Sequence, residues 1–178
     1  MQDFPLTITM VLRHGTRWHA DRKVITATDD GYREASYGTV GERVAQLAHG
    51  MRGLGITGDE RVATFMWNNQ EHLEAYLAAP CMGAVLHTLN IRLFPEQLTY
   101  VVNHAHDRVV IVTDEQAFAS PVDAGRIPVP IYTFNVAGYR AGHLPAGQHG
   151  RYTFGGLTDA AFAMLPALEG LRDGGWPF

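Results

Sequence analysis

Apolar residues recur at helical spacing over residues 40–54, the clearest periodic stretch of this 178-residue chain. Successive members stand four, three, four and three positions apart, which places them on one face of an amphipathic helix: Val40, Val44, Leu47, Met51 and Leu54. Glycines at positions 53 and 55 are expected to end this helix.

Short apolar segments alternate with further helical segments from residue 61 to residue 112. Residues 61–66, 84–89 and 108–112 are predicted strands, and the last of them is apolar on both faces. Continuous apolar strands separated by helices are typical of a parallel sheet covered on both sides. The predicted fold class is therefore α/β: an incomplete parallel sheet with flanking helices, followed after residue 112 by a loop-rich α/β fragment.

The two helices between these strands are predicted from their boundary residues. Asn68 or Asn69 can cap the first helix, and Pro80 is expected to end or kink it. Its inner side is expected to hold three apolar residues: Leu73, Tyr76 and Leu77. Pro95 is expected to begin the second helix. Four apolar positions of that helix share one face: Leu98, Val101, Val102 and Ala105.

The two ends of the chain have a different character. Residues 7–18 are expected to form a short helix, broken or capped near Gly15, before a strand at 23–28, a turn and a return strand at 32–37. After Thr113, residues 131–136 are a strand candidate and 138–152 are expected to be a long loop. A last helix is expected from Thr158 to about Gly170. The segment TFGGLT at 153–158 has some likeness to a phosphate loop, but it lacks a lysine and no strand is predicted before it.

Composition narrows the class of protein. An apolar fraction of 46% and a charged fraction of 18% are those of a globular protein. The formal charge of −4 gives no overall attraction to nucleic acid or to an anionic membrane surface. One cysteine, Cys81, excludes an internal disulfide, and no apolar run is long enough for a signal peptide or a transmembrane segment. We therefore expect a cytoplasmic protein that binds no nucleic acid.

Candidate metal ligands are few. His104, His106 and Asp107 could form a loop site, although a solvated helix end explains them more simply. Asp114 follows an apolar strand, at the edge where open α/β sheets bind ligands, and a carboxylate there can hold Mg²⁺. The alternative is that Asp114 only begins a turn or caps a helix.

Catalytic motifs are absent from the sequence. It contains no nucleophile elbow, no H-E-x-x-H and no Walker loop, and Lys23 is its only lysine. No catalytic residue is therefore assigned, and Asp114 is the one metal candidate, as part of an incomplete site.

Two segments of the chain have a distinctive sequence: GITGDERVATFMWNN at 55–69 and NIRLFPEQLTY at 90–100. On these segments, residues 1–112 resemble the amino-terminal part of the fatty acid–CoA ligases of the adenylate-forming (AMP-binding) superfamily. This resemblance implies an enzyme that uses ATP, Mg²⁺ and CoA to activate a fatty acid, first as an acyl-adenylate and then as a thioester. The resemblance also implies that the phosphate loop and the catalytic lysine lie outside the matched region. We therefore expect this chain to be a truncated and inactive acyl-CoA synthetase that needs no cofactor.

Three segments after residue 106 have a different character: DRVVIVTDEQAF, IPVPIYTFNVAGYRAGH and YTFGGLTDAAFAMLPALEG. On these segments, residues 107–178 resemble a different family, the von Willebrand factor A-like domain of the Ro (TROVE) ribonucleoproteins. This resemblance implies a chimera of two parts, residues 1–112 and 113–178, which share the strand at 108–112. The Asp-x-Ser-x-Ser element of such metal sites is missing here. The alternative functions are therefore a Ro-type binding fragment, or a gene-fusion artefact without function.

Overall fold

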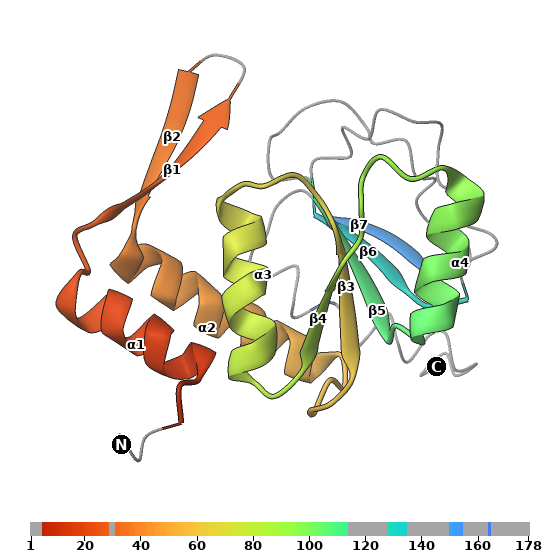
Figure 1. Ribbon diagram of the computed structural model, residues 1–178, viewed down its shortest axis with the longest axis horizontal. Helices are drawn as coiled ribbons and strands as arrows, with labels where there is room; N and C mark the ends of the chain where they lie inside the picture. The colour runs from red at the N-terminus through yellow and green to blue at the C-terminus, as the bar shows by residue number, and fades with distance from the viewer. Residues whose placement is uncertain (1–4, 29–30, 114–127, 135–149, 155–163, 165–178) are drawn as a thin grey trace.

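The computed structural model describes residues 5–28, 31–113, 128–134, 150–154 and 164. Its centre is a parallel five-stranded sheet in the order β4-β3-β5-β6-β7 (Figure 1). The strands have the following bounds: β3 Arg61–Phe65, β4 Val85–Thr88, β5 Val109–Thr113, β6 Ile131–Phe134 and β7 Arg151–Phe154. The prediction of an α/β fold with a parallel sheet and flanking helices is confirmed.

Strand β5 is buried along its whole length, as its apolar sequence predicts. It pairs in parallel with β3 on one side and with β6 on the other. Val109 and Ile111 belong to the core on one face of the sheet, and Val110 and Val112 to the core on the other. Both faces of the sheet are therefore covered, which is why the strand shows no alternation of apolar and polar residues.

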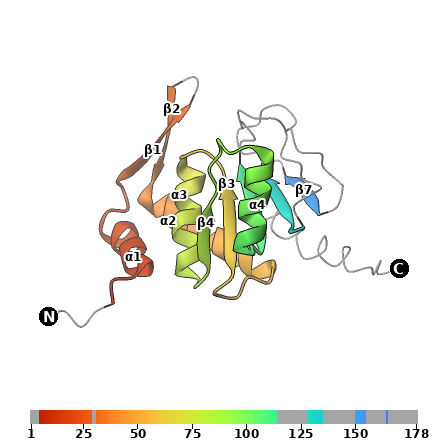
Figure 2. The same ribbon diagram turned by 45° about the vertical axis from the view of Figure 1, so that its right-hand side comes forward.

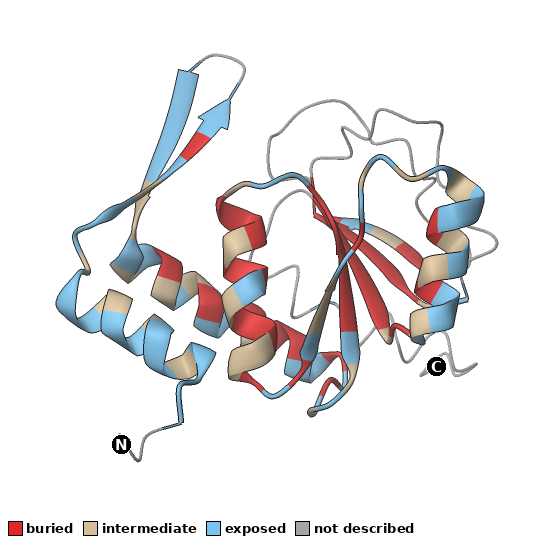
Figure 3. Ribbon diagram, viewed as in Figure 1, coloured by how far each residue is buried: buried red, intermediate tan, exposed pale blue. Residues whose placement is uncertain are grey.

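Helices α2 (Tyr37–Gly53) and α3 (Gln70–Cys81) cover one face of the sheet, and α4 (Pro95–Ala105) covers the other (Figures 1 and 3). All five residues of the apolar stripe at 40–54 are buried in the first core, which confirms the periodic pattern. Helix α4 begins at Pro95, as predicted, and buries Leu98 and Val102. Helix α3 ends one residue after Pro80.

The inner side predicted for α3 is wrong in part: Leu77 is partly buried and packs against the first core, but Tyr76 does not lie on the buried side. Tyr76 is 47% exposed, while Gln70, Glu71 and Glu74 are buried, Glu74 completely. Apart from His72, the remaining buried residues of α3 are small: Ala75, Ala78 and Ala79. A prediction from hydrophobicity alone assigns the leucines and the tyrosine to the buried side of α3. Glu71 and Glu74 are buried instead because arginines from other elements pair with them.

The amino-terminal part forms a separate layer beside the main sheet (Figures 1 and 2). Helix α1 (Ile8–Trp18) precedes an antiparallel hairpin of β1 (Lys23–Thr28) and β2 (Gly31–Ser36), which confirms the predicted hairpin. The break predicted near Gly15 is wrong, because α1 runs through it to Trp18 and ends where the His19 amide donates to the Gly15 carbonyl.

Strand β6 confirms the strand candidate at 131–136, but β7 lies partly in the range predicted to be a loop. Both strands extend the parallel sheet beyond β5, and their rings stack in pairs: Tyr132 on Tyr152 and Phe134 on Phe154, with centroids 5.4 and 5.3 Å apart. A four-residue strand is too short to show a period, which explains the miss. The helix predicted from Thr158 lies largely outside the described residues.

Among the described helices, none combines the length and the hydrophobicity that a membrane span requires.

Candidate functional site

The carboxyl edge of the parallel sheet is the first place to look for a site, because open α/β sheets bind ligands there. Strand β3 ends at Phe65 and is joined to α3 by a short loop. Asn69 caps that helix, since its side-chain oxygen accepts a hydrogen bond from the His72 amide at 2.9 Å. This confirms one of the two caps predicted from the sequence and fixes where His72 lies.

His72 is a buried histidine beside the end of β3. Its Nε2 lies 3.1 Å from the hydroxyl of Thr64, and its ring contacts that of Tyr76 with centroids 4.9 Å apart. Burial lowers the pKa of His72, and a backbone interaction with Trp67 only partly opposes this. The imidazole is therefore neutral near pH 7. Buried against Thr64, it holds α3 to the end of β3, and we assign it a structural role.

Two buried carboxylates of α3, Glu71 and Glu74, lie on either side of His72 in the sequence. Arg33 of the hairpin donates from Nη2 to both carboxylate oxygens of Glu71, at 2.7 Å each. Arg43 of α2 donates from Nε to Glu74 at 2.6 Å, and Gln70 donates to the same oxygen at 2.7 Å. These contacts tie the hairpin and α2 to α3.

Burial and neighbouring charges shift the pKa of two side chains in this cluster. Burial raises the pKa of Glu74, against the hydrogen bonds from Arg43 and Gln70. Burial also pushes the pKa of Arg43 down, but the hydrogen bond and the charges of Glu74 and Glu71 outweigh it and leave that pKa raised. Both glutamates are bound to arginines, so the cluster is better suited to joining elements than to binding a metal ion or a substrate.

The histidines near the end of α4 do not form the loop metal site considered above. Asp107 is buried, and both of its carboxylate oxygens lie 2.9 Å from Nδ1 of His87 in β4. His106 is exposed and takes a left-handed conformation at the end of the helix, while His104 stacks on Tyr100. No three potential ligands meet anywhere among the described residues. The solvated helix end therefore explains His104 and His106, and Asp107 has a structural partner.

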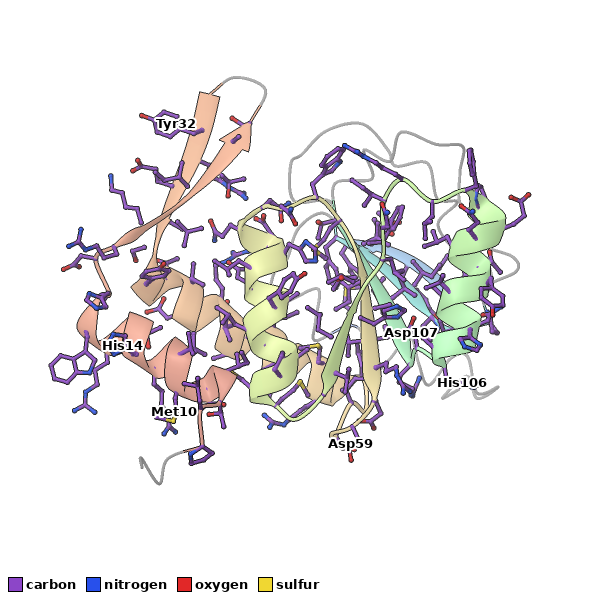
Figure 4. All side chains as sticks on the ribbon, viewed as in Figure 1. Met10, His14, Tyr32, Asp59, His106 and Asp107 are labelled. Carbon is purple, nitrogen blue, oxygen red and sulfur yellow. The ribbon has the colours of Figure 1, made fainter. Side chains whose placement is uncertain are left out.

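A cavity of about 390 Å³ opens beside Asp107, at the amino edge of β5 and β6. Its lining residues are His106, Asp107, Arg108, Pro128, Val129 and Pro130. Burial raises the pKa of Asp107, and the hydrogen bond from His87 partly offsets this. No sequence pattern indicated this cavity, which lies at the opposite edge from the one where such sheets bind ligands. Figure 4 labels two of its lining residues, His106 and Asp107.

The metal candidate Asp114 lies outside the described residues, so its role stays a prediction. The residue before it, Thr113, ends β5 and is buried. Lys23 is exposed on the hairpin and pairs with Glu34, outside the parallel sheet. Strand β7 ends at Phe154, directly before the glycines of the TFGGLT segment. A strand therefore leads into this segment, contrary to the prediction from the sequence, but the segment contains no lysine.

Comparison with known proteins identifies the family. The model of the family described as "AMP-binding enzyme" matches residues 12–140. The chain belongs to this family. It is 38% identical over 111 residues to a 3-methylmercaptopropionyl-CoA ligase of Ruegeria lacuscaerulensis, covering 62% of this chain and 21% of that protein. It is 41% identical over 110 residues to a medium-chain-fatty-acid–CoA ligase of Ectopseudomonas oleovorans, covering 61% and 20% respectively.

The fold agrees with that of solved members of the family. The crystal structure of an anthranilate CoA ligase in complex with anthranoyl-AMP matches with a TM-score of 0.65 and 22% identity, covering 75% of this chain and 27% of that one. At this identity the match shows the fold alone. The chain spans about a fifth of the length of the ligases that it matches in sequence.

The comparisons support only the first of the two resemblances. They give no support to a von Willebrand factor A-like segment, and the family match continues 28 residues beyond position 112. Strands β6 and β7 likewise belong to the same sheet as β3 and β5. The division into residues 1–112 and 113–178 stays a prediction that no finding tests.

Proposed function

We propose that this chain is the amino-terminal part of an acyl-CoA ligase that makes an acyl-adenylate from ATP and a carboxylic acid, and then a CoA thioester. The observation that supports the proposal most is the family match over residues 12–140. In such a ligase the sheet described above is a scaffold. Its substrates would be a fatty acid and CoA, its cofactor Mg²⁺ with ATP, and its location the cytoplasm.

We further propose that the chain is inactive by itself. Adenylation needs preorganised donors and cations around a triphosphate, because these stabilise the charge that develops in the transition state. Lys23 is the only lysine, and its side chain pairs with Glu34 on the exposed hairpin. The described carboxylates that are buried are bound by arginines or by His87.

Fatty-acid-dependent exchange of pyrophosphate into ATP tests this proposal. The pure 178-residue chain is expected to show no exchange above a blank, whereas a full-length medium-chain-fatty-acid–CoA ligase, assayed alongside, is expected to be active. Exchange by the chain that rises with the concentration of fatty acid would contradict the proposed inactivity. The Ro-type binding fragment and the gene-fusion artefact remain as alternatives, without support from the comparisons.

A further inference from the structure

Helix α1 differs from the other described helices because it buries none of its residues. The half-buried residues of α1, among them Thr9, Leu12 and Thr16, face α2 and α3. The apolar residues on the other side of the helix are exposed to solvent. Trp18 is 70% exposed, and Ile8 and Val11 are also exposed. An apolar stripe of this kind on a surface helix commonly marks an interaction surface.

The hairpin extends this surface. Ile25 and Tyr32 lie on the side of the hairpin opposite to Thr26 and Arg33, which contact α3. Their exposed fractions are 63% and 70%. Figure 4 shows Tyr32 at the same end of the molecule as Met10 and His14 of α1, away from the main sheet. We call the exposed residues of α1 and of this side of the hairpin the end face.

The charge of the end face has the opposite sign to that of the whole chain. Helix α1 carries two arginines, Arg13 and Arg17, and no acid, which makes +2 where the chain as a whole is −4. Lys23 adds nothing, because Glu34 pairs with it. Within the described part of the chain, Arg13 and Arg17 form no ion pair, although Arg17 lies over the ring of Trp18 at 5.7 Å.

The occupant of this surface follows from the combination of apolar and basic residues. A second copy of the chain, related by a two-fold axis through α1, would bring two positive faces together, which is unfavourable. An anionic lipid surface offers phosphates to the arginines and an apolar layer to the ring of Trp18 and the side chains beside it. We propose that the end face docks onto the surface of an anionic membrane, with α1 lying parallel to it.

Binding to vesicles tests this. The 178-residue chain is incubated with vesicles of phosphatidylcholine containing about 30% phosphatidylglycerol, or of phosphatidylcholine alone, and the bound fraction is measured by flotation. Binding is expected only with the anionic vesicles, and is expected to weaken as salt is raised. Arg13→Glu with Arg17→Glu is expected to reduce the partition coefficient by at least about tenfold. Trp18→Ser is expected to reduce it several-fold.

Matched controls separate the end face from general properties of the chain. Arg52→Glu with Arg92→Glu makes the same change of net charge elsewhere, and Tyr100→Ser removes an exposed aromatic ring from α4. Both controls are expected to keep at least half of the binding. Circular dichroism is used to check that each variant is folded, and all substituted side chains are exposed.

Three results would overturn the inference. They are equal binding to neutral and anionic vesicles, an equal loss of binding in the control variants, and no vesicle binding together with a concentration-dependent dimer in sedimentation. The test needs neither ATP nor a fatty acid, so its outcome is independent of the proposed ligase function.

Discussion

Gly41 of α2 is expected to tolerate alanine only when Thr16 of α1 has lost its methyl group. A Cβ built at Gly41 lies 2.5 Å from Cγ2 of Thr16 and 3.4 Å from its Cβ. The first distance is far inside van der Waals contact, whereas the second is tight but tolerated. Thr16 cannot easily turn away, because its hydroxyl donates to the Leu12 carbonyl at 3.0 Å and its branched side chain has few rotamers in a helix.

The magnitude follows from two opposing effects. Replacing glycine by alanine inside a helix stabilises it by about 1 kcal/mol. Forcing a methyl group into a closed contact costs about 1–3 kcal/mol. Gly41→Ala is therefore expected to change the free energy of unfolding by between about zero and a loss of about 2 kcal/mol. In a Thr16→Ser background, which keeps the hydroxyl and removes Cγ2, the same substitution is expected to stabilise by about 1 kcal/mol.

Urea unfolding is measured for the parent chain, the two single variants Gly41→Ala and Thr16→Ser, and the double variant. The coupling energy between the two positions is expected to be about 1–3 kcal/mol. Gly15→Ala on α1 is the matched control, because a Cβ at that position has nothing within 4 Å. It is expected to stabilise by about 1 kcal/mol in either background. A coupling near zero, with Gly41→Ala stabilising in both backgrounds, would show that α1 and α2 do not approach each other this closely.

Two further predictions concern pH and metal binding. Burial lowers the pKa of His72, so the contribution of this residue to stability is present above its ordinary pKa of 6.5 and is lost as pH falls. Burial raises the pKa of Glu74, so the contribution of that residue is present below its ordinary pKa of 4.5 and is lost as pH rises. His72→Gln is expected to reduce the loss of unfolding free energy as the pH is lowered from neutral to acid, and Glu74→Gln the loss as the pH is raised from acid to neutral. Each slope is expected to change by at most about 1.4 kcal/mol per pH unit. Unchanged slopes in urea unfolding at a series of pH values would contradict these assignments. For Asp114, calorimetric titration with Mg²⁺ is expected to show millimolar affinity at best, so micromolar binding that Asp114→Asn abolishes would establish a complete site.

Much of the scaffold was predictable because its elements carry strong local patterns. The stripe at 40–54 has a clear helical period, and β5 is apolar at every buried position except Thr113, so α2 and β5 are found where expected. The cap of α3 at Asn69 and the start of α4 at Pro95 depend on the chemistry of single residues, so both can be predicted from the local sequence.

The predictions that proved wrong depend on partners distant in the sequence. Nothing near Glu74 in the chain indicates that Arg43, 31 positions earlier, makes its burial possible. Strand β7 pairs with β6, whose two aromatic rings stack against its own, and no four-residue pattern contains that information.

The sequence by itself determined the fold class, most element boundaries and the presence of a single lysine, Lys23, because these follow from local periodicity and from counting residue types. Only the tertiary structure decided which face of α3 is buried, that Asp107 pairs with His87, and that α1 presents an apolar and basic face to solvent. Burial and pairing are properties of the space between elements. They arise when distant segments meet, so no local pattern can specify them.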